Sequence, residues 1–359
     1  MVALYVTSTE TFSGKTAVCI GLGRRLQHEG YKVGYFKPMS FTARLEEQGA
    51  LDEDSHVIQK ALGIKDPLDA VCPVLITPRV LERIIRGQAP DLVGRIKEAY
   101  AQISRGKDVV IIEGANNLAV GSLIDFSGIE ALEAFDAKGV VVERYRDDMV
   151  IDHLLIAKRV GGDRAVGAVI NTVPINRMEF VEKDVRPFCE KRGIKVFAIL
   201  PQDRFLLSTS VGELVEYLNG EVLCCQDRMD ELVENLMVGA MSVDSALKYF
   251  RRKANKAVIT GGDRPDIQLA ALETSTKCVI LTGNMQPNPI ILGRAEELGV
   301  PMILVRQDTL STVECVEQVF GKVRFHDEKK IAKFEATLNE RFDYAELYAT
   351  LGLAPQSGK

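Results

Sequence analysis

With 359 residues the chain is long enough for about two domains, and its 46% hydrophobic and 26% charged residues are ordinary for a globular protein with a sizeable core. The net charge is −5 with Lys and Arg dispersed, which excludes the basic stripe of a nucleic-acid-binding protein, and no apolar run approaches the ~20 residues that cross a bilayer. Seven cysteines, mostly in apolar stretches, and an N-terminus that begins a strand rather than a signal peptide lead us to expect a reduced, cytoplasmic protein without a membrane partner.

The first two hundred residues alternate short β-branched runs with amphipathic stretches. Strands are expected at residues 3–8, 32–38, 108–114, 138–143, 165–173 and 195–201, and helices at 15–29, 150–160 and 179–192. The strands are apolar on successive residues, which is typical of a parallel sheet covered by helices on both faces. The pattern therefore predicts an α/β domain with a doubly wound parallel sheet.

The pattern changes after Pro201, and we place a domain boundary between Asp203 and Ser210. Residues 202–250 are expected to be mostly helical and connecting, with further strands at 256–262, 277–283 and 301–305. Residues 327–342 predict a charged amphipathic helix on the solvated surface. We therefore expect domains at 1–205 and 206–325, a C-terminal helical extension at 326–359, and independent folding of a fragment from Asp203 to Lys359.

A polar loop, residues 8–16, lies between the first expected strand and the first expected helix. In a phosphate-binding loop, backbone N–H groups and the helix dipole surround the phosphates, the lysine reaches the β- and γ-phosphates, and the next hydroxyl binds Mg²⁺. Gly14-Lys15-Thr16 fits the end of such a loop, although Ser8 stands where the standard loop begins with glycine. A chance match is the alternative, and the strand before and helix after the loop disfavour it.

This loop, followed by the sequence GYKVGYFKP (residues 30–38), resembles the start of dethiobiotin synthetase, whose loop is one residue longer than the standard pattern. The form with Ser8 is closer still to the dethiobiotin-synthetase-like domain that opens long bacterial phosphotransacetylases, in which the serine is usual. The resemblance implies a P-loop NTPase-type fold and a functional loop. The ATP-binding residues that it implies are Thr9, Glu10, Thr11, Ser13, Gly14, Lys15, Thr16 and Asn171.

The same resemblance implies roles for particular side chains. It places Mg²⁺ at Thr16, Asp54 and Glu113, adenine recognition at Asn171, and catalytic roles at Lys15 for the phosphates and Lys37 for a carboxylated substrate. Two carboxylates and a hydroxyl are hard oxygen ligands that suit Mg²⁺. Each position has an ordinary alternative: Asp54 as a helix N-cap, Glu113 as a strand-end surface charge and Lys37 as a solvated lysine.

The likeness to dethiobiotin synthetase weakens after Glu113. That family continues with a pair of glycines, whereas this chain has Asn116-Asn117, and residues 118–128 do not match its substrate lining. The sequence therefore supports nucleotide binding better than it supports that family's substrate.

The second half resembles the DRTGG domain, which accompanies the phosphotransacetylase N-terminal region and certain nucleotide-sensing pyrophosphatases. Asp263-Arg264 match its first pair and Thr282-Gly283 its later part, with Asn284 in place of a glycine. Because Asp263 and Arg264 follow a strand at the mouth of a strand–helix unit, they are candidates for a second ligand site; a helix cap and a local ion pair are the alternative. The relatives imply a homodimer through this domain, with apolar helix faces at residues 236–243 as one candidate contact.

Three functions remain open at this point. A regulatory sensor would bind Mg-ATP and alter the assembly or activity of a partner such as a phosphotransacetylase or another metabolic enzyme. An ATP-dependent ligase of the dethiobiotin synthetase or cobyrinic acid a,c-diamide synthase type would phosphorylate a carboxylate or carbamate, with Lys15 and Mg²⁺ neutralising the transferred phosphoryl group. A purely structural homodimer would have no ATP affinity. The unmatched substrate segment and the accessory nature of a DRTGG module favour the sensor, whether or not it also turns over ATP.

Overall fold

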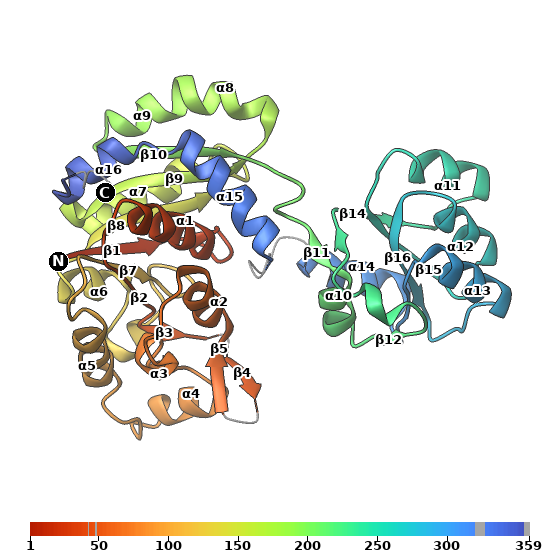
Figure 1. Cartoon of the computed structure of the whole chain (residues 1–359), viewed down its shortest axis with the longest axis horizontal. Helices are drawn as coiled ribbons and strands as arrows, with labels where there is room; N and C mark the ends of the chain where they lie inside the picture. The colour runs from red at the N-terminus through yellow and green to blue at the C-terminus, as the bar shows by residue number, and fades with distance from the viewer. Residues whose placement is uncertain (42, 47–48, 320–326, 355–359) are drawn as a thin grey trace. The chain divides into compact units, whose positions relative to one another are not determined.

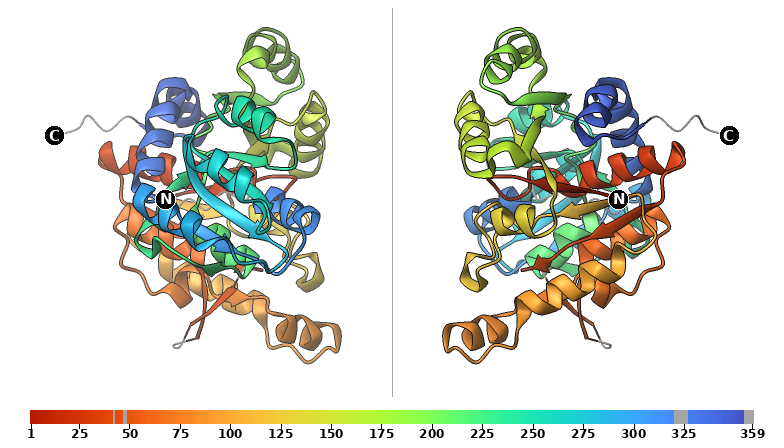
Figure 2. Two further views of the ribbon diagram at one scale, coloured as in Figure 1. Left: turned by 90° about the vertical axis from the view of Figure 1, so that its right-hand side faces the viewer. Right: turned by 90° about the vertical axis from the view of Figure 1, so that its left-hand side faces the viewer.

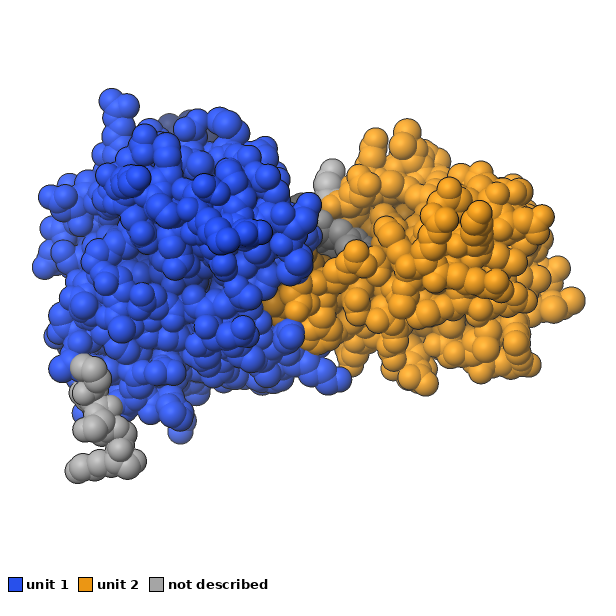
Figure 3. Space-filling model, turned by 90° about the horizontal axis from the view of Figure 1, so that it is seen from above, with its two compact units in different colours: residues 1–202, 325–359 blue, residues 203–324 orange. Residues whose placement is uncertain are grey.

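A computed structural model describes residues 1–41, 43–46, 49–319 and 327–354 and divides the chain into two compact units, coloured separately in Figure 3. The first unit combines residues 1–202 with residues 325–359, and the second consists of residues 203–324. The second unit is therefore an insertion within the first.

Most elements of the first unit are labelled in Figure 1. Its strands are β1 (Val2–Thr7), β2 (Val33–Phe36), β3 (Met39–Ser40), β4 (Ala43–Glu46), β5 (Gly49–Asp52), β6 (Val74–Leu75), β7 (Val109–Glu113), β8 (Lys138–Arg144), β9 (Ala165–Val173) and β10 (Lys195–Pro201). Its helices are α1 (Lys15–His28), α2 (Glu53–Leu62), α3 (Leu68–Val71), α4 (Pro78–Ile85), α5 (Leu92–Ile103), α6 (Gly128–Ala134), α7 (Val150–Gly161), α8 (Met178–Phe180), α9 (Arg186–Glu190), α15 (Glu328–Arg341) and α16 (Tyr344–Leu351).

The main sheet of this unit confirms the predicted doubly wound α/β fold. Six parallel strands lie in the order β10-β9-β8-β1-β7-β2, so β1 is central and its two neighbours, β7 and β8, come later in the chain. Helices α1, α2, α15 and α16 cover one face, and α5, α6, α7 and α9 cover the other. The loop after β1 thus opens at the point where the strand order reverses, the usual place for a ligand in such sheets.

The C-terminal helices pack against the first unit, which corrects the expectation that residues 327–342 form a solvated surface. Figures 1 and 2 show α15 beside α1, and the structure buries Phe334 and Leu338 on its inner face. A Cβ atom on Gly21 of α1 would lie 2.5 Å from the Leu338 side chain, so the two helices approach closely. Most charged residues of α15 are exposed, but Lys330 is buried, and Glu335 pairs with Arg24 of α1 at 3.2 Å. A fragment from residue 203 to 359 would therefore carry helices that belong to the other unit.

The second unit is a smaller α/β sandwich. Its elements are β11 (Thr209–Ser210), α10 (Val211–Leu218), β12 (Glu221–Val222), β13 (Leu232–Val233), β14 (Asn235–Val238), α11 (Val243–Phe250), β15 (Lys256–Gly261), α12 (Pro265–Leu272), β16 (Thr276–Thr282), α13 (Pro289–Leu298), β17 (Met302–Leu304) and α14 (Thr309–Val319). The five-stranded sheet has the order β12-β17-β16-β15-β14, with β12 antiparallel to β17 and the other pairs parallel.

Two details of this unit differ from the expectations. Residues 202–250 are mostly helix and connection as expected, but they also contain four short strands that were not predicted. Residues 236–242 contribute to β14 and the loop after it and Val243 begins α11, so this segment presents mainly a strand and not a helix face. Alternate residues of β15 and β16 face opposite helix layers, one set packing on α10 and α14 and the other on α11, α12 and α13. Both sets are apolar, so the sequence shows no alternating pattern that would have indicated the sheet and its edge strand β14.

Among the helices of the described residues, none is long and apolar enough to cross a membrane. The seven cysteines are free thiols, and five of them are buried, which agrees with their expected role as small core side chains.

Candidate nucleotide-binding site

The loop between β1 and α1 is shaped by a glycine and an asparagine. Gly14 has a φ of 100°, in the left-handed region, and a Cβ atom there would lie 2.4 Å from the Asn171 side-chain nitrogen. That nitrogen, Nδ2 at the carboxyl end of β9, donates a hydrogen bond to the Ser13 carbonyl at 2.9 Å. Only glycine fits this conformation and this approach. Asn171 therefore stabilises the loop by this hydrogen bond. Its expected contact with adenine stays a prediction.

Lys15 is buried and turned into the loop, where its ammonium meets two oxygens. Nζ donates to Ser8 Oγ and to the Asn116 carbonyl, each at 3.0 Å. Burial lowers the pKa of Lys15, because few charges compensate for the lost hydration. The serine that replaces the usual first glycine is thus a hydrogen-bond acceptor for the loop lysine. Asn116, which the sequence only marked as a departure from dethiobiotin synthetase, supplies the second acceptor.

Glu113 and Thr16 meet at the base of the loop. The Thr16 hydroxyl donates to Glu113 Oε1 at 2.7 Å, and the Tyr35 hydroxyl donates to Oε2 at 2.8 Å. Burial raises the pKa of Glu113, while the nearby Lys37 ammonium opposes that rise. Glu113 is 2% exposed, so the alternative of a strand-end surface charge is excluded.

Lys37 is held by two carboxylates. Its Nζ donates to Asp52 at 2.9 Å (Oδ2) and 3.1 Å (Oδ1), and to Asp54 Oδ2 at 2.9 Å. Burial disfavours the ammonium, but the Asp54 and Asp52 charges outweigh it and hold the pKa of Lys37 well above its ordinary value. Asp52 also caps α2 by accepting the Ser55 N–H at 2.9 Å. Lys37 is therefore not a solvated lysine, and the N-cap of this helix is Asp52 and not Asp54.

The oxygen donors near the loop suit Mg²⁺ in kind. Asp54 and Glu113 influence each other electrostatically across Lys37, and the Thr16 hydroxyl touches Glu113. Within the residues that the structure describes, no three His, Cys, Asp or Glu side chains converge as a self-sufficient metal site. An ion here would be bound by a hydroxyl, one or two carboxylates, water and phosphate oxygens, which is the coordination that Mg²⁺ favours in nucleotide sites.

Several buried polar atoms along the loop lack a partner in the described part of the chain. They are Thr7 Oγ1, Thr9 Oγ1, Glu10 Oε1 and Ser13 Oγ, together with Glu143 Oε2 at the carboxyl end of the adjacent strand β8. Buried polar atoms are rarely left without a hydrogen bond, so such a group marks a place where a ligand or water would be stabilised. Thr11 and Phe12, at the tip, are exposed.

Glu143 is a site residue that sequence reasoning missed. The Thr9 backbone N–H donates to its carboxylate, so β8 contributes directly to the conformation of the loop. The same rule that selected Glu113, an acidic residue ending an apolar strand of a parallel sheet, applies to Glu143 and would have found it.

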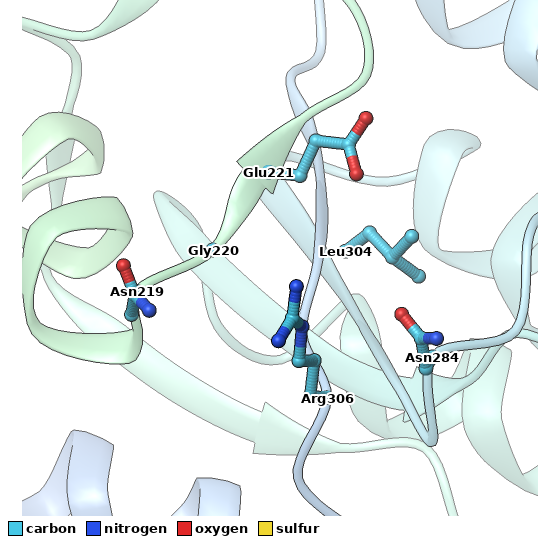
Figure 4. Close-up of a pocket in the computed structure, with 6 residues that line it drawn as sticks. All are labelled: Asn219, Gly220, Glu221, Asn284, Leu304 and Arg306. Carbon is cyan, nitrogen blue, oxygen red and sulfur yellow. The ribbon is translucent and has the colours of Figure 1, made fainter.

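The predicted second ligand site, Asp263 and Arg264, lies at the carboxyl end of β15. Arg264 pairs with Asp266 at 3.1 Å and donates to the Met241 carbonyl at 3.0 Å, as the local ion-pair alternative expected. A pocket of about 440 Å³ opens elsewhere along this edge; it is lined by Asn219, Gly220, Glu221, Asn284, Leu304 and Arg306 (Figure 4). The pocket contains Asn284, the residue in the glycine position of the motif, but neither Asp263 nor Arg264.

Two family models match the chain, one in each unit. An AAA domain model matches residues 2–209, and a DRTGG domain model matches residues 213–319. A phosphate acetyltransferase from Nitratidesulfovibrio vulgaris is 24% identical over 367 residues, which cover 97% of this chain and 51% of that protein. An ATP-dependent dethiobiotin synthetase from Methanococcus vannielii is 26% identical over 205 residues, which cover 55% of this chain and 92% of the synthetase.

Solved structures give a weaker likeness. MinD, the septum site-determining protein of Pyrococcus horikoshii, solved with Mg-ADP, matches 57% of this chain and 83% of its own at 15% identity and a TM-score of 0.34. The CBS and DRTGG domains of a Clostridium perfringens pyrophosphatase, solved with diadenosine tetraphosphate, match 44% of this chain and 82% of their own at 19% identity and a TM-score of 0.30. At scores this low, neither likeness bears on function.

The chain spans about half the length of the phosphate acetyltransferases it matches. The AAA model alone spans more than half of the chain and contains the loop, Asn171 and every acidic residue of the site. The chain therefore belongs to the family of dethiobiotin-synthetase-like AAA domains and carries a DRTGG domain behind it, and over nearly its whole length it is similar to phosphate acetyltransferases.

Proposed function

We propose that the protein binds Mg-ATP at the loop of residues 8–16 and acts as a nucleotide-responsive regulator. The observation that carries nucleotide binding is the position of Lys15, buried at the base of the loop with its ammonium on Ser8 and Asn116, beside the Thr16–Glu113 pair. A buried lysine with a pKa lowered by burial gains stability when phosphate charge arrives next to it.

Different residues of the site would bind the phosphates and the Mg²⁺ of Mg-ATP. The loop N–H groups and Lys15 would hold the phosphates, while Thr16, Glu113 and Asp54 would hold Mg²⁺ directly or through water. The metal would supply neutralising charge on the phosphate oxygens. Thr9, Ser13 and Glu10 carry buried polar atoms that lack a partner in the described residues and lie along the same loop.

The state of Lys37 favours a regulator over a carboxylate-activating ligase. Its ammonium has three N–H donors, and three carboxylate oxygens of Asp52 and Asp54 already accept from it. A carboxylated substrate would have to compete with two carboxylates at one ammonium and would meet their negative charge. The DRTGG unit, an accessory module, points the same way.

The relatives suggest what is regulated. We propose a partner enzyme of the phosphate acetyltransferase kind or another metabolic enzyme, and a homodimer formed through the second unit, in which Asp263, Arg264 or the pocket at Asn284 and Arg306 would take a second ligand. Light scattering of the full chain with and without Mg-ATP measures the assembly; a monomer under both conditions would remove the dimer from this proposal.

The test of nucleotide binding is calorimetric titration of Mg-ATP into the wild type, Lys15→Ala and the control Lys107→Ala. Lys107 is a partly exposed lysine of the same unit that pairs with Asp66 at 3.4 Å, on the far side of the sheet from the loop's carboxyl edge. Lys15→Ala should lose about 10- to 100-fold in affinity, since a charge-assisted contact to phosphate contributes roughly 1.5–3 kcal/mol, and Lys107→Ala should lose little. Equal binding by all three proteins would overturn the assignment.

The test between regulator and ligase is ATP turnover in the presence of a panel of carboxylic acids and diamines. A regulator shows no stimulation by any of them. Stimulated turnover that Lys37→Ala abolishes while Mg-ATP binding persists would establish the ligase instead.

A further inference from the structure

Glu143 is a buried carboxylate joined to the phosphate loop. It follows the apolar core of β8, which pairs with β1, and its side chain is 0% exposed. Oε1 accepts the Thr9 backbone N–H, while Oε2 has no hydrogen-bond partner among the described residues. Oε1 thus helps to hold the loop, whereas Oε2 is buried without a hydrogen bond from the described residues.

The charges around Glu143 do not neutralise it. His153 of α7 has Nδ1 at 3.8 Å from Oε2, beyond hydrogen-bond distance, and Nδ1 also lacks a partner in the described residues. Glu10 of the loop adds a like charge but is itself paired with the largely exposed Arg146 at 2.8 Å. Lys15 of α1 feels the Glu143 charge, yet its hydrogen bonds go to other acceptors.

A carboxylate in this position is close to losing its charge at neutral pH. Burial raises the pKa of Glu143 to about 7, and Glu10 adds to the rise, whereas the Thr9 backbone N–H, the nearby Thr9 hydroxyl and His153 oppose it. The geometry agrees, because this buried carboxylate accepts one backbone hydrogen bond, and its nearest ion-pair candidate, His153, lies 3.8 Å away and is charged only when protonated.

We propose that Glu143 is a positioning residue of the phosphate loop that takes up one proton when a nucleotide binds. The inference rests on the proposed function, since it needs phosphate anions in the loop that Glu143 supports. Their negative charge beside the buried carboxylate is repulsive in a low-dielectric site, and protonation removes the repulsion. The proton comes from the solvent and binds Oε2, forming an O–H bond, while Oε1 keeps the Thr9 N–H.

This coupling makes nucleotide affinity depend on pH in a defined direction. A group that gains a proton on binding strengthens binding as pH falls. Above neutrality, where free Glu143 is mostly ionised, one linked proton changes the affinity by up to about tenfold per pH unit; below neutrality the residue is already protonated and the dependence flattens.

The experiment is titration calorimetry of Mg-ATP into the full chain between pH 6 and pH 8.5, in pairs of buffers with different ionisation enthalpies. The difference between buffers counts the protons exchanged, after the protonation of Mg-ATP itself, measured without protein, is subtracted. The wild type should take up close to one proton near pH 8 and much less near pH 6. Glu143→Gln should remove that proton and leave an affinity that barely changes with pH.

His153→Gln is the matched control, because His153 is the other titratable group facing Oε2. The uptake should persist in this variant; its disappearance would assign the proton to the histidine and overturn the proposal. Wild-type binding without uptake, or uptake unchanged in Glu143→Gln, would overturn it too while leaving nucleotide binding intact. No binding at any pH would overturn both proposals. If Glu143→Gln does not fold, Glu143→Asp keeps a carboxyl group and should retain uptake at a displaced pH, and loss of all pH dependence in that variant would count against the inference.

Discussion

Both units end parallel strands at a carboxyl edge, but the two edges are built differently. In the first unit that edge holds the buried charges of Lys15, Lys37, Glu113 and Glu143, and several polar atoms there lack a partner in the described residues. In the second unit the Thr282 hydroxyl of the motif lies 2.8 Å from the Thr309 hydroxyl, and two buried amide oxygens, Gln268 Oε1 and Gln307 Oε1, lack a partner in the described residues.

The neighbouring glycines of the second unit are hydrogen-bonded and closely packed. Gln268 Nε2 donates to the Gly261 carbonyl at 2.9 Å and to the Gly262 carbonyl at 3.1 Å. A Cβ atom on Gly262 would lie 1.8 Å from the Met285 carbonyl oxygen. The comparison teaches that the first unit's edge gathers buried charged groups while the second unit's edge is closely packed. Partnerless buried polar atoms occur at both edges, so they do not distinguish the two by themselves.

The largest expected effect comes from disturbing the close packing at the carboxyl edge of the second unit's sheet. Gly262→Ala forces Cβ into the Met285 backbone, and overpacking against backbone should cost about 3 kcal/mol of the second unit's free energy of unfolding. Denaturant unfolding, with hydrogen exchange of β15 and β16 to locate the loss, measures it. The matched control is Gly293→Ala in α13, where a Cβ atom has nothing within 4 Å, so the variant should gain roughly 0.5–1 kcal/mol. Equal stability of the two variants would show that the Gly262 approach is not tight.

The second prediction concerns Glu143 at the charged edge of the first unit and the pH dependence that it gives to the protein's stability. Folding raises the pKa of Glu143 from 4.5 to about 7, so the folded state binds this proton more tightly than the unfolded state. The stabilisation is complete below the unfolded pKa and is lost as pH rises through the folded one. Between about pH 4.5 and pH 8, without nucleotide, the wild type should therefore lose about 2–3 kcal/mol relative to Glu143→Gln. Urea unfolding of both proteins at several pH values checks this; parallel curves would contradict it.

The smallest of the three effects concerns the metal. Glu113→Gln keeps an acceptor for the Thr16 hydroxyl but loses the negative charge, so Mg²⁺ should improve ATP affinity about tenfold less than in the wild type, the worth of one weakened charged contact. Glu133→Gln, an exposed carboxylate on α6, is the control and should behave as the wild type does. Titrations with and without Mg²⁺ provide the measurement, and an unchanged Mg²⁺ effect in Glu113→Gln would place the ion elsewhere.

Much of the first unit could be predicted because its signals are local. Successive apolar residues identified β7, β8, β9 and β10 within a residue or two, and the Gly14-Lys15-Thr16 sequence after a strand located the loop. The position of Glu113 could be predicted for the same reason, because ligands bind at the carboxyl ends of the strands in such sheets.

The rest depended on contacts that spacing does not encode. Asp52 and Asp54 lie in one short acidic run, and only the fold shows that Asp52 both caps α2 and binds Lys37. The group of Asn116 that accepts from Lys15 is its backbone carbonyl. Every residue has such a carbonyl, so the residue type could not indicate this contact. The inner face of α15 looked like part of a charged surface helix, because its buried apolar residues Ile331, Phe334 and Leu338 stand among charged residues, one of which, Lys330, is itself buried.

The insertion of the second unit affects the order in which the protein can be completed on the ribosome. Strands β1 to β10 emerge first, yet the face of α1 beside Gly21 remains uncovered until residues 328–351 have followed the whole second unit out of the exit tunnel. Domains generally fold as units during synthesis, so the second unit can fold while the first still exposes an apolar groove to chaperones and to neighbouring nascent chains. The first unit is in this sense the first to be started and the last to be finished.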